Sequence, residues 1–185
     1  MFLRRRRGSA LVEFTLVGIP LMFVIISVFE MARGMWNYHT LQEAVKEGVR
    51  FEAVRGYDLL MNPAAGNTCN LNPDSCGASI RGVARALAAA AIGIPPQNWN
   101  AVLIAGTHSH TCAPVSSCFG NTAQWPPGPP QSLLNPRRDN AVGTPIEIRA
   151  TYTFTSALAM FFPGSQGVKF ATATFAADSQ QSIVY

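Results

Sequence analysis

Charged residues are scarce in this chain of 185 residues: Asp, Glu, Lys and Arg make up 13% of it, against 48% hydrophobic residues. Disordered chains have the opposite balance, so extensive disorder is excluded. The net charge of +4 comes entirely from Arg4, Arg5, Arg6 and Arg7, because ten basic residues face ten acidic ones from Ser9 onward. A nucleic-acid-binding protein spreads its cations over a binding face, so we expect no nucleic-acid partner.

Signatures of the common enzyme classes are also missing. The sequence contains no P-loop, no nucleophile elbow and no H-E-x-x-H zinc motif. Its few acidic residues are scattered, which gives no pattern for paired-carboxylate catalysis. We therefore expect no catalytic residues, no cofactor and no enzymatic activity.

The most informative segment is an uncharged run of sixteen residues, Phe14–Phe29, which follows the arginines. As a helix this run spans about 24 Å, less than the roughly 30 Å of a bilayer core. Adding Gly8–Val12 gives about 33 Å but brings Glu13 into the membrane, at a cost on the order of 3 kcal/mol. Because basic residues stay on the cytoplasmic side, the sequence predicts one spanning helix with Arg4–Arg7 inside and the remainder outside.

Three interpretations of this segment compete. A cleaved secretory signal requires a small-x-small site after the apolar run, whereas Phe29 is followed by Glu30, Met31, Ala32 and Arg33. A plain membrane anchor explains the length and the arginines but leaves Glu13 unexplained. The third interpretation is a type IV prepilin-like leader, in which a peptidase cuts before the apolar segment.

The residues from Arg7 to Phe14, RGSALVEF, resemble the prepilin cleavage motif. The resemblance implies cleavage between Gly8 and Ser9 by a membrane prepilin peptidase, with Glu13 as the fifth residue of the mature chain. Cleavage frees an α-amino group that is cationic at neutral pH. Glu13 is then a counter-charge for the amine of a neighbouring subunit, which fixes the register between packed helices.

Further residues extend the resemblance along the first fifty positions. They are Pro20, Glu30-x-x-Arg33 and Leu41-Gln42-x-Ala44-x-x-x-Gly48-x-Arg50. This block resembles the TadE-like family, minor pseudopilins of Tad or Flp tight-adherence pilus systems. The resemblance implies a non-enzymatic protein of the bacterial inner membrane, or of the pilus and cell surface. Its partners would be the prepilin peptidase, other pilins and the inner-membrane pilus assembly machinery. The alternative is an uncleaved single-pass scaffold or binding module, in which Glu13 faces another membrane helix.

The pattern along the chain predicts three regions: a basic leader at 1–8, the membrane or pilus-core half of a long helix at 9–30, and an extracytoplasmic head at 31–185. Apolar residues at three- and four-residue spacing continue the helix from Ser9 to about Arg55, where Gly56 would end it. Pro20 is expected to bend the helix or simply to be tolerated in it. A second helix is predicted from Ile80 to about Ile92, capped by Ser79.

Short strands complete the predicted head. Ala101–Ala105 is one candidate, Ile146–Phe154 alternates clearly between apolar and polar residues, and Val168–Ala176 is a third. The apolar run 158–163 is too short to span a membrane, and residues 57–78 and 106–145 carry the turn formers of loops. The expected fold is therefore α+β, with a short antiparallel sheet packed on the long helix.

The segment Trp125–Pro130 is rich in proline and cannot form a regular helix or an inner strand. Two interpretations stay open: a polyproline ligand for an aromatic groove, or a surface loop with a buried tryptophan.

Four cysteines, Cys69, Cys76, Cys112 and Cys118, lie on the predicted oxidising side of the membrane, where disulfides form. Three pairings are possible, and the sequence-near pairs Cys69–Cys76 and Cys112–Cys118 close the shortest loops. The rival hypothesis is a membrane-anchored metalloprotein that uses His108, His110 and Cys112, with Cys118 nearby. The spacing does not match the usual structural zinc sites, so we expect disulfides and no metal.

Overall fold

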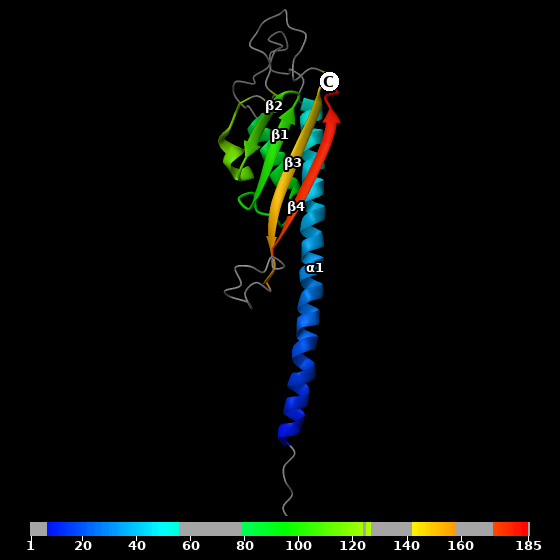
Figure 1. Ribbon diagram of the computed structural model, residues 1–185. Coiled ribbons are helices and arrows are strands. Elements are labelled where there is room, and N and C mark those ends of the chain that lie inside the picture. The colour runs from blue at the N-terminus through cyan, green and yellow to red at the C-terminus, as the bar shows by residue number, and fades with distance from the viewer. Residues whose placement is uncertain (1–6, 56–78, 124, 127–141, 158–171, 185) are drawn as a thin grey trace, which may run out of the picture. The chain divides into compact units, whose positions relative to one another are not determined.

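The computed structural model describes residues 7–55, 79–123, 125–126, 142–157 and 172–184 (Figure 1). The chain divides into two compact units. The first comprises Met1–Trp36 and Thr155–Ala173, and the second comprises Asn37–Phe154 and Thr174–Tyr185. The fold is α+β, as predicted, with two α-helices, one 3-10 helix and four strands in the described residues.

The long helix α1 runs over Arg7–Arg55 and passes through Pro20 without interruption. Leu41, Ala44, Val45 and Val49 lie on its inward face and are fully buried, which confirms the apolar stripe. These positions recur every three or four residues, so a single face of the helix meets the core.

The second helix, α2, spans Ile80–Ala90. Ser79 caps it, because its Oγ accepts a hydrogen bond from the Gly82 backbone N–H at 2.9 Å. The predicted cap is thus confirmed, and the helix ends two residues before the predicted Ile92. Gly93 follows with a φ of 87°, in the left-handed region that favours glycine and stops a helix.

The four strands are β1 (Trp99–Ala105), β2 (His108–Cys112), β3 (Pro145–Thr155) and β4 (Thr172–Ser182). They form one sheet in the order β2-β1-β3-β4. β1 pairs antiparallel with both neighbours, and β3 and β4 run in opposite directions in Figure 1. A two-residue turn joins β1 to β2, with Gly106 at a φ of 56°.

Two parts of the sheet differ from the sequence-based expectations. Residues 106–145 were expected to be irregular, but they contain β2 and a 3-10 helix, η2 (Val115–Gly120). β2 is a polar edge strand, so its inward side chains are not the large apolar residues that usually reveal a strand. β4 continues six residues beyond the predicted end at Ala176. The prediction stopped early because most of these last residues are polar and exposed.

The core lies between the sheet and the helices of the second unit. β3 alternates as predicted, with Ile146, Ile148 and Ala150 buried, and the inward residues of β1 face the same core. Close approach of the helices depends on glycine. A Cβ added to Gly48 would lie 2.5 Å from Leu87 Cδ2, and one on Gly82 would lie 3.3 Å from the Phe51 ring.

Several predicted features lie outside the described residues. They are Arg4–Arg6, Gly56, the loop 57–78 with Cys69 and Cys76, the prolines at 127–130 and the apolar run 158–163.

Candidate functional site

The N-terminal part of α1 is apolar and exposed. Apart from the half-buried Ile26, the large hydrophobic side chains from Leu11 to Trp36 are between 42% and 77% exposed. The polar hydroxyls among them are satisfied within the helix: Thr15 Oγ1 donates to Val12 O at 3.0 Å and Ser27 Oγ to Phe23 O at 2.8 Å. Among the described residues, one helix is long and apolar enough to cross a membrane, and it is this one.

The predicted processing residues lie at the start of the same helix. α1 begins at Arg7, so Gly8 and Ser9 are in its first turn. Glu13 follows just over one turn later, and its side chain is exposed. A carboxylate on an exposed, otherwise apolar helical surface is available to a partner outside this chain.

Glu30 and Arg33 form a charged clamp on α1, one turn apart. Arg33 Nη1 lies 3.7 Å from Glu30 Oε1, and both side chains also bind the backbone at and just after the end of β3. Arg33 Nη2 donates to Thr155 O at 2.8 Å, and the Ala157 N–H donates to Glu30 Oε2 at 3.1 Å. The two charges therefore neutralise each other and satisfy two backbone groups, which is the structural role of the Glu-x-x-Arg motif.

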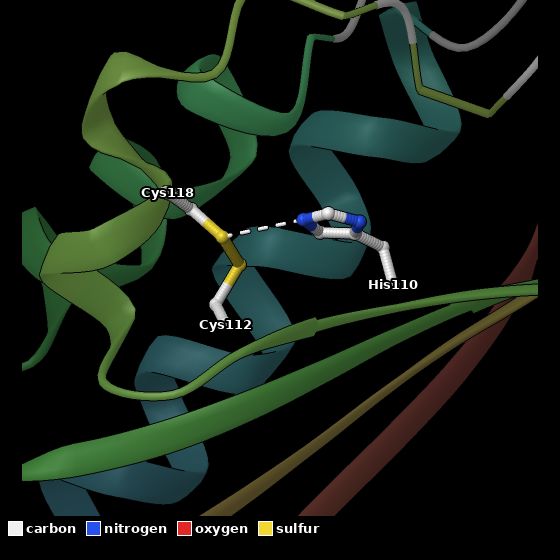
Figure 2. A group of neighbouring side chains, drawn as sticks. All are labelled: His110, Cys112 and Cys118. Carbon is white, nitrogen blue, oxygen red and sulfur yellow. Dashed lines mark hydrogen bonds between the residues drawn. A yellow bond between two sulfur atoms is a disulfide. The ribbon is translucent and has the colours of Figure 1, made fainter.

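A second cluster forms on the inward side of β2. His108, His110 and Cys112 alternate along the strand and pair with Ala105, Leu103 and Ala101, the buried positions of β1. Cys112 is bonded to Cys118 of η2, with the two Cα atoms 5.6 Å apart. His110 Nε2 lies 3.5 Å from Cys118 Sγ, and Figure 2 shows the imidazole pointing at the disulfide.

His110, Cys112 and Cys118 are residue types that bind metal ions, but a disulfide joins the two cysteines. The ligand atoms of His110, Cys112 and Cys118 lie within 4.8 Å of one another. However, zinc and related ions bind cysteine as thiolate, and the disulfide leaves no thiolate here. His108, the first residue of the metalloprotein hypothesis, is exposed at the far end of β2. This geometry favours a buried staple between β2 and η2.

The Trp125 ring lies next to the His110 ring, with ring centroids 6.1 Å apart, and Trp125 is itself 4% exposed. The buried-tryptophan interpretation of this segment is therefore correct for Trp125. Next to it lies Glu52 of α1, whose side chain is fully buried. Neither carboxylate oxygen of Glu52 nor Nε1 of Trp125 meets hydrogen-bond geometry with any described atom.

Burial raises the pKa of the Glu52 carboxyl from 4.5 to about 8, and the nearby Trp125 N–H acts in the opposite direction. The cause is desolvation, which disfavours the charged form of an acid. Glu52 is thus mainly neutral at neutral pH. Sequence analysis missed it, although Leu41, Val45, Gly48 and Glu52 share one helical face. The signal for a buried Glu52 is its position in line with the apolar residues of this helical face.

Together these features define a class of protein: an α+β chain with one membrane-compatible N-terminal helix, part of which is built into the core of the second unit. Residues 8–50 match the family model described as TadE-like protein, which confirms the resemblance over that segment. A match to the TadE-like family points to a Tad pilus-related membrane protein. No curated protein and no solved structure matches the chain.

Proposed function

We propose that this chain is a minor pseudopilin that takes part in assembling a Tad or Flp-type adhesive pilus. Residues 1–8 act as a leader, residues 9–30 enter the membrane and then the pilus core, and residues 31–185 form an extracytoplasmic head. One observation carries the proposal: the family match at 8–50 coincides with an exposed apolar helix surface that nothing in the described chain covers. Such a surface requires lipid or neighbouring subunits.

The order of events follows from the charges. Arg4–Arg7 hold the N-terminus in the cytoplasm, so the head emerges on the other side of the inner membrane. The prepilin peptidase then cuts between Gly8 and Ser9 and leaves a cationic amine on Ser9. Glu13 of one subunit pairs with the amine of the next, and this pairing sets their relative height within the pilus base or filament. Other pilins and the inner-membrane assembly machinery are the expected partners.

The test of processing is the N-terminus and intact mass of the membrane-extracted chain, with and without the host's prepilin peptidase. We expect a peptidase-dependent chain that begins at Ser9. Gly8→Glu should block the cut, because a side chain there obstructs a narrow subsite. Gly18→Ala is the matched control, since a Cβ at Gly18 comes no closer than 3.8 Å to its neighbours. A chain that keeps Arg4–Arg7 would support the uncleaved scaffold instead.

The test of assembly is Glu13→Ala. We expect the variant to be cleaved normally but to lose incorporation and pilus formation. Glu47→Ala is the control, because Glu47 is an exposed glutamate on the same helix, beyond the apolar part. Normal piliation by the Glu13 variant would remove the proposed role of this carboxylate.

A further inference from the structure

Among the residues that the structure describes, His110, Cys112 and Cys118 are the one group of three metal-ligand side chains whose ligand atoms lie close together. All three belong to the second unit, with His110 and Cys112 on β2 and Cys118 on η2. Oxidised sulfur is a weak hydrogen-bond acceptor, so the disulfide offers the imidazole little. Once reduced, the same sulfurs offer much more, because thiolate and imidazole are the ligands that zinc prefers.

The nitrogen and one sulfur of this cluster already have the separation found in a zinc site. His110 Nε2 lies 3.5 Å from Cys118 Sγ, and Figure 2 shows the imidazole directed at that sulfur. In a tetrahedral site with a Zn–N distance of about 2.0 Å and a Zn–S distance of about 2.3 Å, a nitrogen and a sulfur ligand lie about 3.5 Å apart. Two sulfur ligands lie about 3.8 Å apart in the same geometry. The main change required is therefore separation of the two sulfurs after their bond is broken.

Backbone hydrogen bonds hold the two cysteines in place independently of the disulfide. Cys112 lies within the ladder that joins β2 to β1. η2 is attached to the segment before β1, because the Ser116 N–H donates to Pro96 O at 3.1 Å. The residue after η2 is attached to α2, where the Arg81 N–H donates to Asn121 O at 2.9 Å. Reduction therefore leaves the two thiols close to each other on a supported backbone.

His110 is placed to be the third ligand. It pairs with Leu103, a buried position of β1, which puts its side chain on the inward side of β2. The Trp125 ring packs beside the imidazole. His110 is half-buried whereas both cysteines are buried, so it is the ligand that solvent reaches. Two cysteines and one histidine with an open fourth position are a known zinc ligand set.

We propose that reduction of the Cys112–Cys118 disulfide converts this cluster into a zinc site with His110 Nε2 and the two Sγ atoms as ligands and water as the fourth. A dithiol reductant supplies the two electrons: its thiolates break the S–S bond, it becomes a disulfide itself, and two cysteine thiols remain. Zinc then displaces the two thiol protons and binds both thiolates. Zinc and the disulfide are thus alternative states of one cluster, whatever the role of the chain in a pilus.

Cobalt(II) titration tests the site on the full chain in detergent, in a Cys69→Ser, Cys76→Ser background that leaves two cysteines. The chain is reduced with dithiothreitol, which is then removed under nitrogen. We expect stoichiometric Co²⁺ to give a sulfur-to-cobalt charge-transfer band, and Zn²⁺ to abolish it. The oxidised chain should give no such band. A reduced chain without the band, or an oxidised chain with it, would overturn the proposal.

His110→Gln separates a ligand from a residue that only packs, because the amide is polar and of similar length but binds zinc poorly. We expect the zinc affinity of the reduced chain to fall by more than the about 10- to 100-fold that loss of a second-shell partner costs. His108→Gln is the matched control, at an exposed position of the same strand, and should keep the affinity. Equal affinities of these two variants would show that the ligand set is wrong.

Circular dichroism and a competition assay cover the case in which the reduced chain loses its fold. Zinc should then restore the fold, because the free energy of binding a structural metal is also folding free energy. Zinc should also slow closure of the disulfide by oxidised glutathione, followed by mass spectrometry, since it binds the reduced state alone. A reduced chain that stays unfolded in zinc, or that closes its disulfide equally fast with and without zinc, would refute the site.

Discussion

The two parts of α1, residues 7–36 and residues 37–55, belong to one continuous helix but have opposite surroundings. Up to Trp36 the large side chains are exposed, whereas from Leu41 onward the apolar face is fully buried against α2 and the sheet. The difference shows that one continuous helix serves two environments, with apolar residues on nearly all sides in the first part and on a single face in the second. In the second half glycines and alanines permit close helix contact, and in the first half the apolar residues surround the helix and suit lipid or neighbouring subunits.

The largest expected effect on stability concerns Glu52, the buried acidic residue in the 37–55 part of α1. The carboxyl of Glu52 stays protonated in the folded chain up to a pKa of about 8, while in the unfolded chain it ionises near 4.5. Its contribution to the free energy of unfolding is therefore complete below pH 4.5 and declines as pH rises to about 8, by on the order of 1 kcal/mol per pH unit. We expect urea unfolding of the full chain in detergent, followed by tryptophan fluorescence, to show this decline.

Glu52→Gln should remove most of that pH dependence, because the amide does not ionise. Glu47→Gln, at an exposed position of the same helix, should keep it. An unchanged pH profile in the Glu52 variant would mean that other groups set the slope.

The second prediction compares one glycine from each half. Gly48→Ala should destabilise the chain by about 2 kcal/mol, because its Cβ would clash with Leu87 Cδ2 at 2.5 Å and Cγ at 2.9 Å inside the core. Gly18→Ala should leave the free energy of unfolding nearly unchanged. Denaturant titration of both variants checks the contrast, and equal losses would show that the halves do not differ in packing.

The third prediction concerns the Cys112–Cys118 disulfide of the second unit. Cys112→Ser combined with Cys118→Ser should lower the free energy of unfolding by about 2 kcal/mol, since the bond closes a short loop. Thr111→Ala, at the exposed neighbouring position, is the control for changes in β2. Thermal melts measure the difference. Stoichiometric zinc with free thiols in the native chain would instead favour the metalloprotein hypothesis.

The smallest effect is expected at the clamp. Arg33→Met removes a hydrogen bond to Thr155 O and an exposed ion pair, so the cost should be within about 1 kcal/mol. Hydrogen exchange at the Ala157 amide should quicken slightly, because Glu30 loses its counter-charge. Arg50→Met, at an exposed position in the 37–55 part of α1, should leave the exchange rate of the Ala157 amide unchanged. A loss as large as that for Gly48→Ala would mean that the clamp organises the core as well.

Sequence patterns predicted the parts of the fold in which local signals and packing agree. α1, the Ser79 cap and the alternation of β3 follow directly from periodicity and capping chemistry. β2 and the second half of β4 were missed because edge strands need little apolar alternation. The clamp joins positions 127 and 122 residues apart, and the environment of Glu52 depends on a tryptophan from another segment. Such long-range contacts leave no local signature.

The Glu30–Arg33 clamp also fixes how α1 is rotated about its own axis relative to the 155–157 backbone. Sliding α1 by one residue along the backbone of 155–157 would turn its surface by about 100° and break both hydrogen bonds. Arg33 and Glu30 therefore hold the helix in one rotational orientation against the 155–157 backbone. In that orientation Met35 is exposed. Every copy of the chain consequently has Met35 at the same angle around the helix relative to the 155–157 backbone.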